Sequence, residues 1–305
     1  MEHPLRSDKH KSLRKDFSFV LKNGFTIQRQ SNIVFVCGGN DLAHMRRRFQ
    51  KEFKKLLPDY EFFEPEFAMK NYFTLGDDNP FDISEFEELV GELAISIVLF
   101  PEAPGSFAET GYFSARPDLA KKIVLAIDAS RQRSDSFISL GPAKKIHDTS
   151  VFQPNIQLNY NNPDFEMIST RIKERAPLHS KKQSFSMKKF SETRTFELFS
   201  LIQQIVQMLA FATTEDIEFI LMGLYGGHIS HSKVKKVISI LVGAGRLVEV
   251  GEYGHLRVAE GKGSFLHLKD GFKTQYMELT VSVSSTFLEA EPELQMLAKG
   301  NGNVD

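Results

Sequence analysis

Two acidic residues flank a turn rich in Gly and Pro. The segment Leu99–Asp128 reads LFPEAPGSFAETGYFSARPDLAKKIVLAID and holds Glu102 and Glu109 between two apolar stretches. An ionised carboxylate beside a sugar can attack the anomeric carbon, or stabilise the oxocarbenium ion that forms as a nucleobase leaves. Glu109 is therefore a candidate catalytic residue for cleaving an N-glycosidic bond, and Glu102 a candidate for binding substrate hydroxyls or the leaving base. The alternatives are that Glu109 complements a helix dipole and that Glu102 is a solvated loop residue.

Two turns that contain glycine follow apolar, strand-like runs. The first is CGGN (Cys37–Asn40) and the second is PEAPGS (Pro101–Ser106). Glycine lets the backbone approach a ligand closely, and free N–H groups at a helix start favour anions. Tight turns without a ligand are the alternative, and a buried small residue is favoured over a nucleophile at Cys37. The candidate substrate-binding residues are Cys37, Gly38, Gly39, Glu102, Pro104, Gly105 and Ser106.

The elements around these turns alternate between strands and helices. The apolar patterns predict strands at residues 32–39, 60–66, 95–100 and 122–128, and helices at 41–57, at 82–94 and from 105 onward. Strands separated by helices favour parallel pairing and right-handed crossovers. The first half is therefore predicted to be an α/β domain with a doubly wound parallel sheet. Ligands of such sheets bind at the carboxyl ends of the strands, where both turns fall.

The second half has a different pattern. An Asn- and Pro-rich stretch precedes Arg171–Phe190, which contains seven Lys or Arg and one Glu. Helical patterns follow at 192–212, 214–227 and 230–245, and a predicted hairpin spans 246–260. This order is typical of a winged helix, whose last helix usually contacts a nucleic-acid groove. A dimerising winged helix and a solvated linker are the alternatives. The candidate phosphate contacts are Lys181, Lys182, Lys188, Lys189, Lys233, Lys235, Lys236 and Arg246.

Composition limits the class of protein. The 305 residues exceed one typical core and predict two domains, and the net charge of −1 excludes a strongly basic protein. Cys37 is the single cysteine, which excludes intramolecular disulfides and fits a reducing cytoplasm. No apolar run reaches the ~18 residues of a membrane span, and the N-terminus has no signal-peptide core. We therefore expect a soluble cytoplasmic protein. His228 and His231 have no further ligand cluster, so we expect no metal site.

The sequence GSFAETGYFS resembles the Gly-Ser/Thr-x-x-Glu-x-Gly segment of nucleoside 2-deoxyribosyltransferases, in which the Glu is the nucleophile. It is more similar still to the deoxyribosyltransferase-like effector toxins of bacterial retrons, which also share IVFVCGG, LFPEAPGSFAETGYFS and a segment like FISLGPAKKI. The resemblance covers residues 32–146, and the second half is similar in layout. It implies a Rossmann-like, deoxyribosyltransferase-like domain in which Glu109 is the catalytic carboxylate. Gly38, Gly39 and the Pro104–Ser106 turn would line the nucleotide pocket.

One departure from the transferases bears on the reaction. Transferases usually carry aspartates just before the Gly-Ser/Thr, whereas this chain has PEAP there. Hydrolysis of a larger nucleotide is therefore favoured over transfer between free nucleosides. The resemblance implies an N-glycosidase toxin of antiphage defence that releases nicotinamide from NAD and uses no cofactor. The implied partners are a retron reverse transcriptase and its msDNA, with several copies in the assembly.

Two other functions stay open. The enzyme could act on a nucleoside or on other nucleotides, by hydrolysis or deoxyribosyl transfer. The chain could instead be a DNA-binding regulator that senses a nucleotide. The expected organisation is an N-terminal helical extension at 1–30, the catalytic domain at 31–150, a basic linker at 151–191, a winged helix at 192–270 and a C-terminal extension at 271–305.

Overall fold

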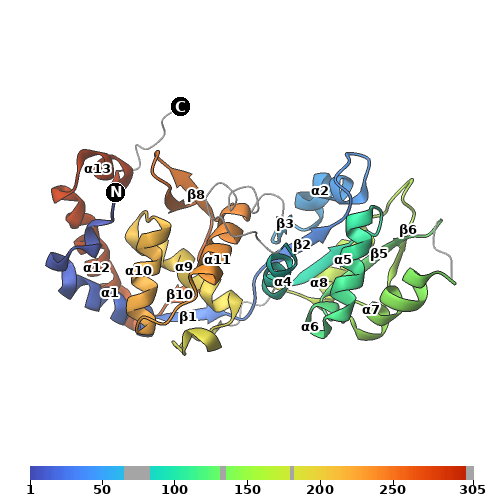
Figure 1. Ribbon diagram of the computed structural model, residues 1–305, viewed down its shortest axis with the longest axis horizontal. Helices are drawn as coiled ribbons and strands as arrows, with labels where there is room; N and C mark the ends of the chain where they lie inside the picture. The colour runs from blue at the N-terminus through green and yellow to red at the C-terminus, as the bar shows by residue number, and fades with distance from the viewer. Residues whose placement is uncertain (65–82, 131–134, 179–181, 300–305) are drawn as a thin grey trace. The chain divides into compact units, whose positions relative to one another are not determined.

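The computed structural model describes residues 1–64, 83–130, 135–178 and 182–299 (Figure 1). Its chain divides into two compact units. The central unit comprises Gln30–Glu66 and Asn79–His179. The described residues of the terminal unit are 1–29 and 182–299.

A parallel sheet forms the core of the central unit. The described residues place five strands in the order β3-β2-β4-β5-β6, all parallel. Their bounds are Glu61–Phe63 for β3, Ile33–Cys37 for β2, Ser96–Leu99 for β4, Ile123–Asp128 for β5 and Ile156–Leu158 for β6. Every residue of β2, β4 and β5 is buried, as expected for parallel strands covered on both faces. The α/β class and the parallel sheet agree with the sequence prediction.

Helices cover both faces of this sheet (Figure 1). Helices α2 (Met45–Leu56) and α8 (Glu166–Arg175) contribute Phe49, Phe53 and Ile168 to one apolar cluster with β2, β4 and β5. On the other face, Phe35 of β2 meets Phe113 of α5 with ring centroids 6.0 Å apart. The remaining helices of this unit are α4 (Ile83–Leu93), α5 (Pro104–Ala115), α6 (Pro117–Ala120), the π-helical turn Ser139–Ala143 and α7 (Lys144–Thr149).

The stretch expected to be a basic linker belongs largely to the central unit. Strand β6 adds a fifth strand to the sheet, and α8 packs on the apolar cluster. Arg171, counted among the linker cations, donates from Nη1 to the carbonyl oxygens of Phe152 (2.6 Å) and Pro154 (2.8 Å). The prediction of a linker from residue 151 was wrong because a three-residue edge strand among Asn and Pro leaves too weak a periodic pattern to detect.

The terminal unit joins the two ends of the sequence through a small antiparallel sheet. Strand β1 (Phe25–Gln28) pairs with both β7 (Lys182–Ser184) and β10 (Leu266–Leu268). Helix α1 (Lys11–Asn23) contacts α10 and α12. Residues 1–29 are therefore an integral part of this unit rather than a separate extension.

Three helices and a hairpin follow β7 in the predicted order. They are α9 (Thr195–Leu209), α10 (Thr214–Tyr225), α11 (His231–Gly243), β8 (Leu247–Val250) and β9 (His255–Val258). The face of α11 that the sequence predicts to be apolar is buried, including Val234, Val237 and Leu241. Helices α12 (Lys273–Thr286) and α13 (Pro292–Ala298) come next. Short 3₁₀ turns occur at Pro4–Arg6, Asp8–His10, Phe190–Glu192, Asp270–Phe272 and Phe287–Glu289.

Within the described residues, none of the helices combines the length and the apolar character needed to cross a membrane.

Candidate active site

The carboxyl ends of the parallel strands meet at one edge of the central sheet. Cys37 at the end of β2 is in register with Leu99 at the end of β4, and Asp128 of β5 with Leu158 of β6. Both glycine-containing turns therefore begin at this edge, as the sequence predicts. Their proximity makes this edge the candidate site.

Glu109 lies in the second turn of α5, beside the end of β2. One of its carboxylate oxygens is buried. Burial raises the pKa of the Cys37 thiol, and the negative charges of Glu109 and Glu87 raise it further, as does a hydrogen bond to Glu109. The thiol is therefore protonated and donates to the Glu109 carboxylate. This favours Cys37 as a neighbour that orients Glu109 over Cys37 as a thiolate nucleophile.

Glu102 accepts hydrogen bonds from three backbone N–H groups. Its carboxylate lies 3.0 Å from the nitrogen of Gly39, 2.7 Å from that of Met45 and 3.3 Å from that of Arg46. The last two belong to the first turn of α2, whose N–H groups have no partner within the helix. Glu102 thus caps α2 from a distant turn and fastens the first glycine turn to it. These bonds give Glu102 a structural function beside its predicted binding role.

The two glycines of the first turn pack closely against the start of α2. A Cβ at Gly38 would lie 2.8 Å from Cβ of Arg46 and 2.9 Å from Oε1 of Glu102, and one at Gly39 would overlap the His44 ring. A side chain at Gly38 would displace the start of α2, because Cβ of Arg46 cannot move without its backbone. A side chain at Gly39 would require the His44 ring to move. The packing of the turn thus favours glycine at both positions, whether or not a ligand binds there.

Ser106 organises the second turn. Its hydroxyl oxygen accepts from the backbone nitrogens of Glu102 and Ala103, both at 3.0 Å, and donates to the carbonyl oxygen of Ala103 at 2.9 Å. Ser106 is buried, whereas Pro104 and Gly105 are exposed. Pro104 occupies the first helical position, where its ring fixes φ at a value suited to the helix. The hydrogen bonds of Ser106 fix the turn that leads into α5, the helix that carries Glu109.

A cavity of about 570 Å³ opens at the same edge. Glu102 lines it, together with Asp128 and Tyr160, whereas Glu109 lies outside its lining. The serines on its wall are Ser130, Ser136 and Ser139. A polar cavity of this size at the carboxyl edge fits a nucleotide-sized ligand.

Asp128 and Tyr160 line this cavity, and the sequence alone assigned neither of them a role. The carboxylate of the nearly buried Asp128 accepts from the backbone nitrogen (3.0 Å) and the hydroxyl (2.7 Å) of Ser130. Tyr160 donates to the carbonyl oxygen of Ala126 at 2.9 Å, and burial raises its pKa, with the charges of Glu102 and Asp128 adding to the effect. The end of a buried strand was a visible signal for Asp128. Tyr160 gave none, because it lies in the stretch taken for a linker.

The described residues contain no group of three or more His, Cys, Asp and Glu side chains arranged to hold a metal ion.

Comparison with known proteins decides the family. The family described as "STM3845 retron effector protein" matches residues 43–249, which is more than half of the chain. The chain belongs to this retron effector family. The resemblance expected from the sequence is confirmed, and the match includes segments of both units.

Two curated relatives of the effector are proteins of Escherichia coli. One is named "Retron Ec86 putative ribosyltransferase/DNA-binding protein" and is 34% identical over 129 residues, 41% of each chain. The other is named "Retron Ec73 putative ribosyltransferase/DNA-binding protein" and is 28% identical over 136 residues, 42% of each chain. The effector thus matches about two fifths of the length of these relatives.

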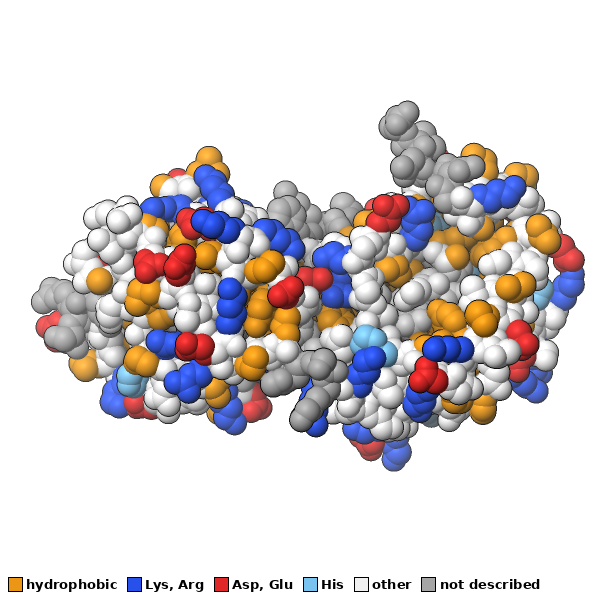
Figure 2. Space-filling model, turned by 180° about the vertical axis from the view of Figure 1, so that it is seen from behind, with side chains coloured by type: hydrophobic (Ala, Val, Ile, Leu, Met, Phe, Trp, Pro, Cys, Tyr) orange, Lys and Arg blue, Asp and Glu red, His pale blue; other side chains and the backbone are white. Residues whose placement is uncertain are grey.

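The predicted nucleic-acid contacts are the lysines that precede α9, the lysines at the start of α11 and Arg246. Lys182, Lys188 and Lys189 are exposed, and Lys181 lies outside the described residues. Lys233, Lys235 and Lys236, at the start of α11, are half-buried, and Nζ of Lys233 donates to the carbonyl oxygen of Thr193 at 3.4 Å. On the face shown in Figure 2, Lys and Arg side chains occur interspersed with Asp and Glu.

Arg246 is held inside the terminal unit. Its side chain is buried, and Nη1 donates to Oε1 of Gln203 and to the carbonyl oxygen of Gly263, both at 2.9 Å. The guanidinium carbon lies 3.9 Å from the centre of the Phe265 ring. Arg246 thus joins α9 to the segment before β10 and presents no exposed charge to a phosphate. The prediction of a phosphate contact here is corrected.

Proposed function

We propose that the effector is an N-glycosidase that hydrolyses the bond between nicotinamide and ribose in NAD, with Glu109 as the catalytic carboxylate. The observation that carries the proposal is the position of Glu109, in the second turn of α5 at the carboxyl edge of the parallel sheet, with the Cys37 thiol as its neighbour. The names of the two relatives, which include ribosyltransferase, support chemistry at a glycosidic carbon.

The leaving group explains why one carboxylate suffices. The nicotinamide nitrogen of NAD is cationic, so when its bond to C1′ breaks the electron pair neutralises the ring and no acid is needed. Glu109 attacks C1′ to form an ester or stabilises the oxocarbenium ion. Water then bonds through its oxygen to C1′ and loses a proton; where an ester has formed, the bond between C1′ and the Glu109 oxygen breaks in this step and the carboxylate is released. The products are nicotinamide, ADP-ribose and one proton.

The other residues of the edge would hold the substrate. The cavity lined by Glu102, Asp128 and Tyr160 would bind the part of the nucleotide remote from the scissile bond. Carboxylates accept hydrogen bonds from ribose hydroxyls. In this arrangement Glu102 keeps the first glycine turn in place while Asp128 contacts the sugar.

The terminal unit would provide the control. The order α9, α10, α11 and the β8–β9 hairpin fits a winged helix, and the exposed Lys182, Lys188 and Lys189 precede it. We assign to this unit the contact with a reverse transcriptase and its msDNA, which would restrain the enzyme within an assembly of several copies. Lysines that contact phosphates make such binding dependent on salt.

The first prediction concerns Glu109. The purified effector is incubated with NAD, alone and with its reverse transcriptase–msDNA complex, and released nicotinamide is measured by chromatography. Glu109→Gln is expected to lose release by about 10³-fold or more while keeping its thermal stability, because the amide cannot stabilise the developing charge. Glu166→Gln, an exposed carboxylate in the first turn of α8, is the matched control and is expected to release nicotinamide normally.

Two other results of this experiment would favour the alternative functions. Cleavage of nucleosides or other nucleotides, with NAD intact, would move the reaction to another substrate. Binding of a nucleotide without cleavage would favour a nucleotide-sensing regulator, in which Glu109 complements the helix dipole.

A further inference from the structure

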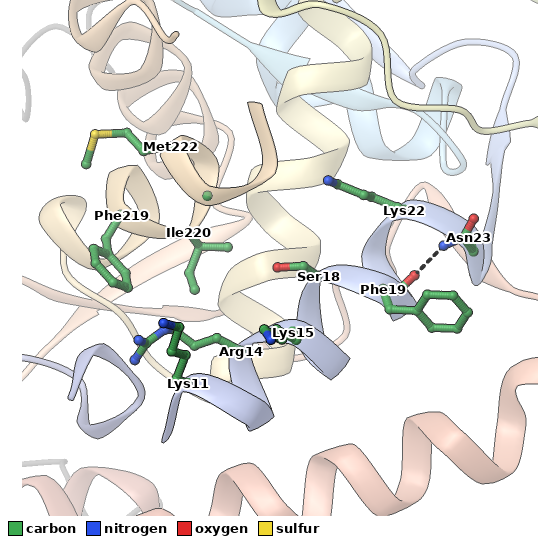
Figure 3. Close-up of a pocket in the computed structure, with 11 residues that line it drawn as sticks. Lys11, Arg14, Lys15, Ser18, Phe19, Lys22, Asn23, Phe219, Ile220 and Met222 are labelled. Atoms are coloured by element: carbon green, nitrogen blue, oxygen red, sulfur yellow. Dashed lines mark hydrogen bonds between the residues drawn. The ribbon is translucent and has the colours of Figure 1, made fainter. Parts of the chain in front are cut away.

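A groove of about 600 Å³ lies between α1 and α10, within the terminal unit (Figure 3). Its apolar floor is formed by Phe219, Ile220 and Met222 of α10. Methionine is a flexible apolar side chain that adapts to the shape of a bound partner. The floor therefore favours a ligand with apolar groups to bury.

The rim of the groove is cationic. Lys11, Lys15 and Lys22 of α1 line it, and all three are exposed. Their spacing of four and seven residues places them on one face of the helix. Arg14 also lines the groove, and the described lining residues include no Asp or Glu. The rim therefore favours an anionic ligand.

Aromatic side chains in the groove are poorly placed to stack on nucleobases. The Phe219 ring is covered by the guanidinium groups of Arg6 and Arg14, at 5.4 Å and 5.5 Å from its centre. Phe19 is 51% exposed, but its ring already packs at 6.0 Å against Phe272. Single-stranded nucleic acids need open aromatic faces beside the cations. An acidic peptide with apolar side chains fits this groove better.

The spacing of the lysines along α1 indicates the length of a helical peptide that the groove could bind. Lys11 and Lys22 are separated by eleven residues, which corresponds to ~16 Å along α1, or about three helical turns. A helix of that length presents an apolar residue to the floor at every third or fourth position. Asp and Glu on its flanks would then face the lysines.

We propose that this groove binds an amphipathic helix of a protein partner, with apolar anchors on Ile220 and Met222 and acidic flanks against the lysines of α1. The site is distinct from the candidate active site and from the lysines that precede α9. It does not depend on the reaction assigned to Glu109.

The second prediction tests this groove in the full-length effector. The probe is a fluorescein-labelled synthetic peptide of about 16 residues, with Leu at every third or fourth position and Glu on both flanks. We expect it to bind, and the double variant Lys15→Glu/Lys22→Glu to weaken binding by about tenfold or more, because charge attraction becomes repulsion. Lys51→Glu/Lys54→Glu, which reverses two exposed charges on α2, is expected to bind the peptide normally.

Two further probes separate the ligand classes. A twin peptide with Lys in place of Glu is expected to bind at least about tenfold more weakly, and a dT20 oligonucleotide is expected to bind equally to wild type and to the groove variant. The proposal is overturned if the acidic peptide does not bind, if the twin binds equally well, or if the groove variant keeps its affinity. Loss of oligonucleotide binding in that variant would instead assign the groove to nucleic acid.

Discussion

At the scale of single residues, Glu102 in the second glycine turn and Glu109 in the helix that follows it have different surroundings. Glu102 accepts hydrogen bonds from three backbone N–H groups, whereas Glu109 lies beside the protonated thiol of Cys37. The sequence identifies both residues as acidic and close in the chain. It cannot assign the hydrogen bonds of Glu102, because their donors lie about 60 residues away, on another element.

The third prediction follows from these bonds. Glu102→Ala leaves three N–H groups without their acceptor and removes a negative charge from the start of α2. We expect the free energy of unfolding to fall by about 1–3 kcal/mol, measured by urea denaturation. The free energy of unfolding of Glu102→Gln is expected to lie between those of Glu102→Ala and the wild type, because the amide oxygen still accepts hydrogen bonds. Glu52→Ala, an exposed position on α2, is the control, and equal stability of the two Ala variants would contradict the capping role.

At the scale of elements, Lys122 stabilises the end of α4. Its Nζ donates to the carbonyl oxygens of Gly91 (3.1 Å), Glu92 (2.7 Å) and Ala94 (2.9 Å). The last carbonyls of a helix have no partner within it, and a cation there complements the dipole. Burial lowers the pKa of Lys122 to about 8, so part of this gain is offset by loss of hydration.

The fourth prediction compares two adjacent lysines. Lys122→Met should destabilise the central unit by about 1–3 kcal/mol, because the three carbonyl groups lose their donor. In a thermal melt this corresponds to a decrease of several °C, on the order of 2–4 °C per kcal/mol. Lys121→Met changes an exposed lysine paired with Asp118 and should melt like wild type. Equal melting temperatures for the two variants would exclude the role of Lys122.

The elements differ in how well their sequences predict them. Strands β2, β4 and β5 are compact apolar runs, and their burial on both faces is visible in composition alone. Strands β6 and β7 have three residues each, and β7 is the polar sequence Lys-Gln-Ser. Such strands form because partners from distant parts of the chain supply the hydrogen bonds, so the local sequence pattern does not predict them.

At the scale of the whole molecule, a buried histidine couples acidity to the stability of the terminal unit. His3 lies between the rings of Phe211 and Phe287, with centroids at 5.7 Å and 5.1 Å. Its Nδ1 accepts from the backbone nitrogen of Leu5 and its Nε2 donates to the carbonyl oxygen of Leu209, both at 3.1 Å. These bonds require the neutral ring, and burial lowers the pKa of His3 to about 4.

The fifth prediction is a loss of stability in acid. In the unfolded chain His3 takes up a proton near pH 6.5, whereas in the fold it does so only near pH 4. Between these values the unfolded state binds more protons, so the free energy of unfolding decreases as the pH falls, by on the order of 3 kcal/mol at pH 4. Urea denaturation at several pH values is expected to show a shallower dependence for His3→Gln. The exposed His147→Gln should keep the wild-type slope, and identical slopes for all three proteins would contradict the assignment.

The division of the molecule into units was only partly predictable. The alternation of strands and helices indicates a parallel α/β unit, and the order of α9, α10, α11 and the hairpin is visible in the periodicity. The assignment of residues 1–29 to the terminal unit is not visible in the sequence, because β1 pairs with strands that lie more than 150 residues away. Arg246 was misplaced for a related reason, since its acceptor Gln203 lies on α9.

The pairing of β1 with β7 makes the central unit an insertion. Gln28 and Lys182 are directly opposite each other in the antiparallel ladder, so the chain leaves the terminal unit and re-enters it at adjacent positions. Within the central unit, Nε2 of Gln30 donates to the carbonyl oxygen of Pro177 at 3.1 Å, so its two ends also meet. Domains with adjacent ends tolerate transplantation and circular permutation. We therefore expect that the segment between residues 28 and 182 can be replaced by a tight turn, which would separate the candidate catalytic unit genetically from the antiparallel sheet of the effector.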